Sequence, residues 1–374
     1  MFHRSLCLVQ GRKLWLFLSV LMFVVILSFF QYNYLKLKED RDKLEATVSK
    51  LQTYYNLKEN AKLQKQRRDY DEGQLIIYNR VPKTASTSFV NVAYDLCKKN
   101  GFNVLHLNVT GNLHFMSIAD QARFIRNITK WTEKKPAIYH GHVAFIDFLK
   151  FGAREKPIYL NLLRRPLDRL VSYYYFLRYG DNFRPHLIRR KHGDKMTFDE
   201  CVQQKQPDCN PENMWLQIPF LCGHSSECWE PGNEWALEEA KRNLLSHYLV
   251  VGVTEQLTDF IAVLEATLPS FFSGAIEHFK SSKKGHLRKT NQKIEPNEET
   301  IRQIKSTVIW KMENELYEFA LQQFQFLKKR MERNKDGDLV DKGHPVYRET
   351  LWPHVLAMIL TTLTLALVNS TSKY

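Results

Sequence analysis

The sequence predicts an α/β domain built on a parallel central sheet. Three apolar runs of strand length, 75–78, 157–163 and 248–253, are each followed by a turn or a segment with helical periodicity. Such alternation is typical of parallel sheets, because two parallel strands need a crossover helix between them. Residues 137–139 are a further strand candidate, and 300–331 place apolar side chains near one face of one long helix.

Composition agrees with a globular domain that binds an anionic partner. The 374 residues include 44% hydrophobic and 25% charged side chains, which excludes a mainly disordered or collagen-like chain. Lys and Arg number 54 against 40 Asp and Glu, a net charge of +14. This excess predicts nucleic acid, a membrane surface or an acidic polymer as the partner.

The N-terminus predicts a membrane anchor. Residues 14–30 form an uncharged apolar run, and residues 1–13 before it carry basic but no acidic side chains. This pattern favours a transmembrane signal anchor with a cytoplasmic N-terminal tail. A cleaved signal peptide is the alternative, although bulky residues at 29–32 do not fit a cleavage site. Both interpretations place the rest of the chain in the secretory pathway and disfavour nucleic acid.

A stalk, a catalytic domain and a tail follow the anchor. Residues 31–73 repeat Leu37, Leu44 and Leu51 at heptad spacing, which predicts a short coiled coil or a solvated helix, although Arg41 occupies one seam position. We expect the folded domain over 74–340. The tail 341–374 contains an apolar run, 351–368, that fits a second membrane span, a lipid-anchor signal or a segment docked on the core.

Four clustered cysteines and two sequons fit an oxidising compartment. The spacings predict the disulfides Cys201–Cys209 and Cys222–Cys228. A zinc site is the alternative, although these spacings differ from the usual two-residue separation. Asn108 and Asn127 are candidate N-glycosylation sites.

Two segments predict phosphate or sulfate sites where a strand meets a helix. In the first, Lys83 lies among four hydroxyl residues, Thr84, Ser86, Thr87 and Ser88. Backbone N–H groups and a helix N-terminus there would bind an anion, whereas simple helix capping would not explain the lysine. The glycines of an ATP-binding loop are absent between Gly73 and Gly101. In the second segment, Arg164 and Ser172 fit another phosphate, or alternatively a surface arginine cluster.

Together these segments resemble the two cofactor loops of sulfotransferases that use 3′-phosphoadenylyl sulfate. Longer strings within 74–338 resemble the heparan sulfate 2-O-sulfotransferases: Asn79-Arg-Val-Pro-Lys-Thr-Ala-Ser-Thr-Ser, Tyr139-His-Gly-His, Leu170-Val-Ser-Tyr-Tyr-Tyr-Phe-Leu-Arg, Trp215-Leu-Gln-Ile-Pro-Phe, Cys222-Gly-His-Ser-Ser-Glu-Cys and Trp310-Lys-Met-Glu-Asn-Glu. The resemblance implies a P-loop-NTPase-like sulfotransferase domain. It also implies a homotrimeric, single-pass type II protein of the Golgi membrane with a lumenal catalytic domain.

The resemblance also implies a reaction and its residues. A sulfuryl group would move from 3′-phosphoadenylyl sulfate to the 2-hydroxyl of iduronic, less often glucuronic, acid in heparan sulfate, without a metal. His142 corresponds to the general base, His140 to its catalytic neighbour and Lys83 to the cation at the leaving phosphate. The implied cofactor contacts are Lys83, Thr84, Ala85, Ser86, Thr87, Ser88, Arg164, Ser172, Thr290 and Lys293. The implied polymer contacts are Arg80, Tyr94, His106, Arg189 and Arg288.

Two positions depart from the family pattern, and two other functions remain as alternatives. Arg165 stands where the family usually has Asp, and Gly111 stands where we expect Lys. One alternative is a uronyl 2-O-sulfotransferase acting on dermatan or chondroitin sulfate. The other is a catalytically inactive protein that binds heparan sulfate.

Overall fold

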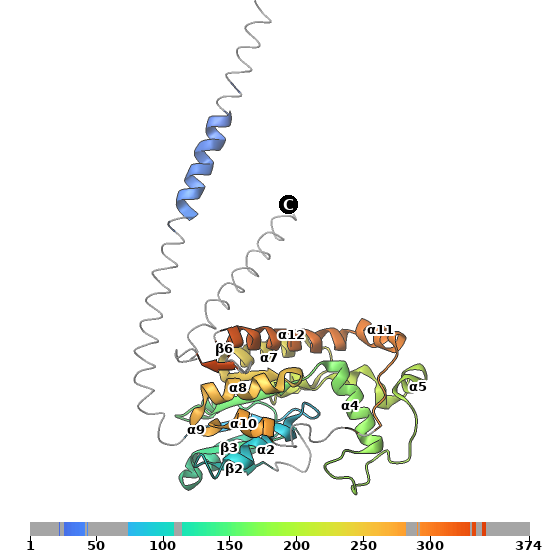
Figure 1. Cartoon of the computed structure of the whole chain (residues 1–374). Coiled ribbons are helices and arrows are strands. Elements are labelled where there is room, and N and C mark those ends of the chain that lie inside the picture. Colours follow the sequence, from blue (N-terminus) through green and yellow to red (C-terminus); the bar gives the residue numbers. More distant parts are fainter. Residues whose placement is uncertain are drawn as a thin grey trace, which may run out of the picture. The chain divides into compact units, whose positions relative to one another are not determined.

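The structure is a computed structural model that describes residues 22, 26–41, 43, 74–107, 114–281, 290, 292–329, 331–333 and 339–341. The chain divides into two compact units, 1–69 with 352–374, and 70–351. Most of the expected anchor, together with Asn108, Gly111, Arg288 and the tail 342–374, lies outside the described residues. Figure 1 shows the described elements of each unit.

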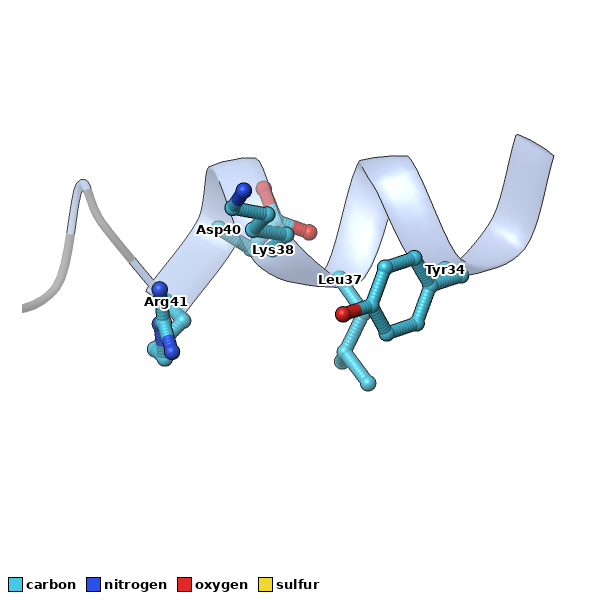
Figure 2. A pocket seen from close by; sticks show the side chains of 5 residues that line it. All are labelled: Tyr34, Leu37, Lys38, Asp40 and Arg41. Atoms are coloured by element: carbon cyan, nitrogen blue, oxygen red, sulfur yellow. The ribbon is translucent and has the colours of Figure 1, made fainter. Parts of the chain in front are cut away.

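In the first unit, residues 26–41 form a continuous helix within the expected anchor and stalk. Figure 2 shows Tyr34, Leu37 and Arg41 on one side of this helix, with Lys38 and Asp40 on the other. Tyr34 and Leu37 are 67% and 71% exposed, so the hollow that these five side chains line is open helix surface. Two of the expected seam residues, Leu37 and Arg41, therefore lie with Tyr34 on one exposed face.

No single helix in the described ranges is long and apolar enough to cross a membrane. One pair of helical segments, Thr254–Thr267 and Pro269–Ser281, meets the length and composition criteria together but is bent by 117°. Its apolar side chains, among them Phe260, Leu264 and Phe272, are buried in the core of the second unit.

The second unit contains the predicted parallel sheet. Its five strands lie in the order β2 (Asn103–His106), β3 (Ala137–Gly141), β1 (Leu75–Asn79), β4 (Ile158–Leu163) and β5 (Tyr248–Val253), and every neighbouring pair is parallel. Strand β2 was not predicted; it has four residues, lies at the edge of the sheet and is only partly buried. β3 continues two residues beyond the predicted run, so His140 belongs to the strand.

Helices connect and cover the strands: α2 (Ser86–Leu96), α3 (Ile118–Lys130), α4 (Pro166–Tyr179), α5 (Phe198–Gln203), α6 (Gln217–Cys222), α7 (Glu234–His247), α8 (Leu257–Thr267), α9 (Pro269–Phe272), α10 (Ala275–Ser281), α11 (Glu298–Ser306) and α12 (Val308–Lys329). α12 packs along α7 and β5 (Figure 1). A short antiparallel pair, β6 (Met331–Arg333) and β7 (Leu339–Asp341), follows it.

The prediction of one helix over 300–331 was wrong, because two helices meet at Thr307. The backbone of Thr307 is extended, with φ −73° and ψ 147°. Its hydroxyl accepts a hydrogen bond of 3.3 Å from the Trp310 N–H, so it satisfies a free donor at the start of α12. Apolar periodicity continues across the break and therefore does not reveal it.

Buried amides fix the end of β1, where the site begins. Nδ2 of Asn161 donates to both the backbone oxygen and Oδ1 of Asn79, each at 2.8 Å. The Tyr248 hydroxyl donates to the same Oδ1 at 3.0 Å, and Asn79 Nδ2 donates to the Phe220 carbonyl at 3.0 Å. All of these side chains are buried, so this network holds β1, β4 and β5 in register.

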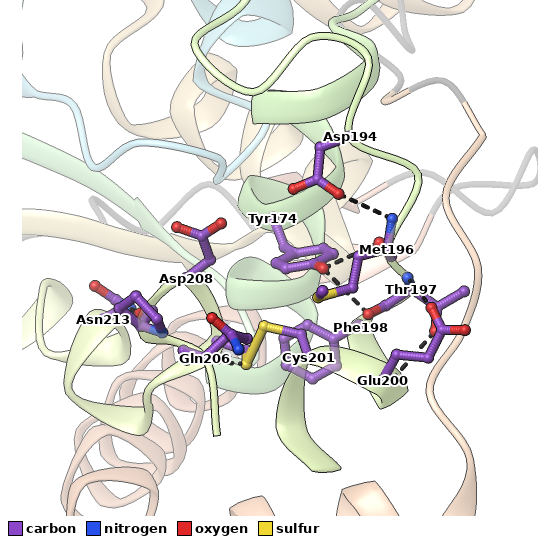
Figure 3. Close-up of a disulfide and its surroundings, with 12 residues drawn as sticks. Tyr174, Asp194, Met196, Thr197, Phe198, Glu200, Cys201, Gln206, Asp208 and Asn213 are labelled. Carbon is purple, nitrogen blue, oxygen red and sulfur yellow. Dashed lines mark hydrogen bonds between the residues drawn. A yellow bond between two sulfur atoms is a disulfide. The ribbon is translucent and has the colours of Figure 1, made fainter. Parts of the chain in front are cut away.

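Both predicted disulfides, Cys201–Cys209 and Cys222–Cys228, are formed. Figure 3 shows the first beneath α4, where the Tyr174 hydroxyl donates to the carbonyls of Met196 and Thr197 at 3.0 and 3.1 Å. The buried Arg178 binds Asp194 and Asp208 at 2.7 and 3.0 Å. These contacts tie the C-terminal end of the segment between α4 and α5, and Asp208 beyond α5, to α4. Among the described residues, no group of His, Cys, Asp or Glu is placed to hold a metal ion.

Candidate active site

The turn between β1 and α2 has the shape of an anion cradle. Lys83 and Ala85 adopt left-handed backbone conformations, with φ of 68° and 56°. Such conformations cost energy in residues other than glycine and concentrate at binding sites. The Thr84 hydroxyl donates to the Val81 carbonyl at 2.9 Å, which tightens the turn. No side chain caps the N-terminus of α2, so its first N–H groups remain available to a ligand.

Lys83 meets three other predicted cofactor residues at this turn. Its Nζ donates a hydrogen bond of 3.0 Å to Oγ1 of Thr290. That oxygen lies 3.2 Å from Oγ of Ser172 on α4. Arg164, at the end of β4, donates from Nη1 to the Lys83 carbonyl at 3.2 Å. Residues from three segments far apart in the sequence thus bring two cations and two hydroxyls together at this turn.

Phe176 holds two cations at its ring. Nζ of Lys83 and Cζ of Arg189 each lie 4.3 Å from the ring centroid. Nε and Nη2 of Arg189 are buried and have no hydrogen-bond partner among the described residues, and Nη2 lies 3.7 Å from Oδ1 of Asp181. Buried donors without partners and two adjacent cations favour an anionic ligand here. Phe176 was not among the predicted residues, although it follows Ser172 by one helical turn and so shares its face.

Buried side chains from α6 and α12 hold Arg164 in place. The Arg164 N–H donates to Oε1 of Gln217 at 2.8 Å, and Nε2 of Gln217 donates to Oε2 of Glu313 at 3.1 Å. The Glu313 carboxylate also accepts from the N–H groups of Leu216 and Ile218. The side chain of Arg165, the departure from the family, is exposed beside this network. It therefore leaves Arg164 in position.

His142 contacts the backbone through one imidazole nitrogen. Its Nδ1 lies 2.7 Å from the backbone oxygen of Arg80. A carbonyl oxygen only accepts hydrogen bonds, so Nδ1 must carry the proton. In the neutral ring Nε2 then carries a lone pair and can accept a proton, as a general base must.

His140 is the opposite tautomer, with its proton on Nε2. Its Nδ1 lies 3.4 Å from Nη1 of Arg80, which only donates, so Nδ1 is the accepting nitrogen. Its Nε2 therefore donates to the Tyr94 hydroxyl at 3.0 Å. Burial first, and then the charge of Arg80, lowers the pKa of His140 to about 3. His140 is thus a neutral donor at physiological pH.

Arg80 joins the histidines to the anion cradle. Its Nε and Nη2 lie 3.3 and 3.4 Å from Oγ of Ser86, and Nη2 lies 3.3 Å from Oγ1 of Thr87. The exposed ring of His106 lies next to the ring of His140, with the two centroids 5.0 Å apart. The predicted polymer residues Arg80, Tyr94 and His106 are therefore adjacent to the predicted catalytic residues.

Other predicted residues lie outside this group or are not described. Lys293 pairs with Glu295 at 2.7 Å. Ser88 is buried in the first turn of α2, directly after the cradle. Asn127 lies exposed on α3, where a glycan would have room. Asn108 and Arg288 fall outside the described residues.

The comparisons with known proteins agree with this geometry. The sequence profile of the sulfotransferase family matches residues 66–320. Heparan sulfate 2-O-sulfotransferase 1 of Homo sapiens is 53% identical over 90% of this chain and 95% of its own length, and that of Xenopus laevis is 54% identical over the same shares. Heparin sulfate O-sulfotransferase of Drosophila melanogaster is 62% identical over 70% of this chain and 75% of its own length. The chain therefore belongs to the sulfotransferase family and, within it, to the heparan sulfate 2-O-sulfotransferases.

Proposed function

We propose that the chain transfers a sulfuryl group from 3′-phosphoadenylyl sulfate to the 2-hydroxyl of iduronic, less often glucuronic, acid in heparan sulfate. The observation that carries this proposal is the pair of opposite tautomers at His140 and His142, on either side of Arg80. They supply one proton acceptor and one neutral donor next to an anion cradle. The names of the relatives supply the substrate class, and their matches to this chain cover 95% of the relatives' length.

The residues present fit the cofactor. The cradle around Lys83 and the hydroxyls of Ser172 and Thr290 favour phosphate or sulfate oxygens. Bound there, 3′-phosphoadenylyl sulfate would supply the sulfuryl group. The residues proposed to hold it are Lys83, Thr84, Ala85, Ser86, Thr87, Ser88, Arg164, Ser172, Thr290 and Lys293.

The chain supplies acid–base and electrostatic catalysis. Nε2 of His142 takes the proton of the sugar 2-hydroxyl as that oxygen bonds to sulfur. Lys83 stabilises the negative charge that the phosphate oxygen gains when its bond to sulfur breaks. His140 stays neutral and orients Tyr94 at the acceptor. Arg80, Tyr94, His106, Arg189 and Arg288 are proposed to hold the polymer, whose negative charge matches the net charge of +14.

We also propose a Golgi membrane location with the catalytic domain in the lumen. The apolar run 14–30, its basic flank and the two disulfides support this orientation. The exposed face of Tyr34 and Leu37 supports a homotrimer joined through the stalk.

Sulfate transfer by the full-length chain, purified in detergent, tests the proposal. The chain receives labelled 3′-phosphoadenylyl sulfate with desulfated heparan or dermatan, and the products are digested to disaccharides. We expect label at the 2-O position of heparan uronic acid, and none with His142→Ala. Label mainly on dermatan would instead identify the uronyl enzyme. Nucleotide binding without transfer to any acceptor would identify a heparan-binding protein.

A further inference from the structure

One aromatic ring on α4 contacts a cation from each of the two proposed substrate sites. Nζ of Lys83, which is proposed to contact the cofactor, lies 4.3 Å from the centroid of the Phe176 ring. Cζ of Arg189, which is proposed to contact the polymer, lies at the same distance from that centroid. The face of an aromatic ring is negative and attracts cations, so Phe176 stabilises two positive charges that repel each other.

The position of Arg189 depends strongly on this ring. Its Nε and Nη2 are buried and have no hydrogen-bond partner among the described residues. Oδ1 of the buried Asp181 lies 3.7 Å from Nη2, which is too far for a hydrogen bond but close enough for an ion pair. A Cβ at Gly180 would lie 3.6 Å from Nε, so the side chain passes close to the end of α4. The ring and a long ion pair therefore hold these nitrogens in place.

Lys83 contacts the same face of α4 through a hydroxyl and the ring. Its Nζ donates a hydrogen bond of 3.0 Å to Oγ1 of Thr290, which lies 3.2 Å from Oγ of Ser172. Phe176 follows Ser172 by one helical turn, so its ring lies beside these hydroxyls. A lysine side chain has four rotatable carbons, and a second contact restricts the positions that its ammonium can occupy.

The backbone also ties both segments to the C-terminal end of α4. Asp181, just after the helix, forms an antiparallel β-bridge with Thr290. The Lys191 N–H, two residues after Arg189, donates to the Leu177 carbonyl at 2.9 Å. The ring therefore has a fixed place between a segment of the proposed cofactor site and a segment of the proposed polymer site.

We propose that Phe176 is a positioning residue that holds Lys83 for the cofactor and Arg189 for the polymer. This proposal rests on the proposed function, which assigns the two cations to these two substrates. Removal of the ring should weaken the binding of both substrates, because both cations lose the same contact. An apolar side chain that only fills space could be replaced by another without this double loss.

Three variants of the full-length chain, purified in detergent, test the proposal. Phe176→Leu keeps an apolar side chain but removes the ring, whereas Phe176→Tyr keeps the aromatic face. Trp131→Leu is the control, because it removes a partly exposed ring at the end of α3 that Lys134 contacts at 5.7 Å. Calorimetry measures Kd for adenosine 3′,5′-bisphosphate and for a desulfated heparan oligosaccharide. Urea unfolding of the same samples shows whether each variant is folded.

We expect Phe176→Leu to raise both Kd values about fivefold, which is the effect of losing one partly buried contact between a cation and a ring. Phe176→Tyr should stay within about twofold of the parent for both ligands. Trp131→Leu should leave both Kd values unchanged. An equal loss in the Tyr and Leu variants, or a loss for only one ligand, would overturn the proposal.

Two double-mutant cycles show whether the ring acts through the cations. Lys83→Met and Arg189→Met remove each charge but keep a long side chain. In the Lys83→Met background, Phe176→Leu should no longer change Kd for the nucleotide. In the Arg189→Met background, it should no longer change Kd for the oligosaccharide. A fivefold loss that persists in these backgrounds would show that Phe176 acts by packing alone, and would also overturn the proposal.

Binding measurements separate this proposal from the proposed function. A parent chain that binds both ligands but transfers no sulfate would contradict the proposed reaction, while the two cycles would still decide the role of Phe176. If Lys83→Met and Arg189→Met left both Kd values unchanged, the assignment of the cations to the two substrates would be wrong, and the positioning role of Phe176 would be wrong with it.

Discussion

Lys83 and Thr290 lie 207 positions apart in the chain, yet Nζ of one donates a hydrogen bond of 3.0 Å to Oγ1 of the other. The same oxygen contacts Ser172, so one hydroxyl links the two predicted anion-binding segments. Asp181 and Thr290 also form a β-bridge, which brings the segment at Thr290 against the end of α4. A substitution at Thr290 should therefore change the affinity for the nucleotide.

Thr290→Val should weaken binding of adenosine 3′,5′-bisphosphate about tenfold. Valine has the same shape, so the loss corresponds to one charge-assisted hydrogen bond, ~1.5 kcal/mol. Calorimetric titration measures it. Thr290→Ser is the control, because it keeps the hydroxyl and should bind within about twofold of the parent. Equal affinity of the Val and Ser variants would show that Thr290 holds Lys83 only when no nucleotide is bound.

The buried neutral His140 should make the folded protein less stable in acid. Its pKa is about 3 in the fold and near 6.5 when unfolded, so below pH 6.5 the unfolded chain binds more protons. Stability is therefore full above pH 6.5 and is lost as the pH falls toward 3. Between pH 7 and pH 5 this group should lower the free energy of unfolding by about 2 kcal/mol.

Urea unfolding of the parent and of His140→Gln at pH 5 and 7 measures this contribution. The variant should lose about 2 kcal/mol less than the parent between the two pH values. Burial also lowers the pKa of His224, to about 4, so some pH dependence should remain in the variant. An identical pH dependence in His140→Gln and the parent would show that His140 is protonated in the fold.

The glycine between the two histidines is required by close packing. A Cβ at Gly141 would lie 2.6 Å from the Leu107 oxygen and 2.7 Å from the Leu107 Cβ. Backbone atoms must then move, and His140 and His142 move with them. We expect Gly141→Ala to lower kcat at least about tenfold.

Gly152→Ala is the control for that experiment. It meets no atom within 4 Å but has φ of 75°, so it adds strain without a clash. It should cost about 1 kcal/mol of stability and leave kcat unchanged. Wild-type kcat in Gly141→Ala would mean that β2 and β3 can separate without moving the histidines.

Local sequence accounts for much of the fold. The buried strands β1, β4 and β5 are apolar runs bounded by turns, and α4 starts at a proline, so short-range rules find them. Strand β2 escaped these rules because an edge strand of four residues lacks a continuous apolar run. The short-range rules did not predict the break at Thr307, because only the three-dimensional path of α11 and α12 requires it.

The candidate site, like the fold, can be predicted from the sequence only in part. The hydroxyl-rich turn and the His-Gly-His string are contiguous, so their chemistry is visible in the sequence. The tautomers are not, since they depend on Arg80 lying 60 residues from His140 and 62 from His142. Phe176 was missed because an aromatic residue on a buried helix face usually indicates core packing alone.

Glu313 and Glu315 offer a direct test of how the core supports the site. Glu313 is fully buried and accepts hydrogen bonds from Leu216, Gln217 and Ile218, whereas Glu315 lies on the surface and pairs with Lys241. Glu313→Gln would turn an amide donor toward N–H groups and leave Arg169 without a nearby countercharge. It should lower the free energy of unfolding by about 3 kcal/mol.

Urea denaturation should show a change of less than about 1 kcal/mol for Glu315→Gln, as for other surface ion pairs. The folded fraction of Glu313→Gln should also bind adenosine 3′,5′-bisphosphate more weakly, because Gln217 would no longer hold the Arg164 N–H at 2.8 Å. A destabilised variant with unchanged nucleotide affinity would separate the two roles. It would show that Arg164 keeps its position through its bond to the Lys83 carbonyl instead.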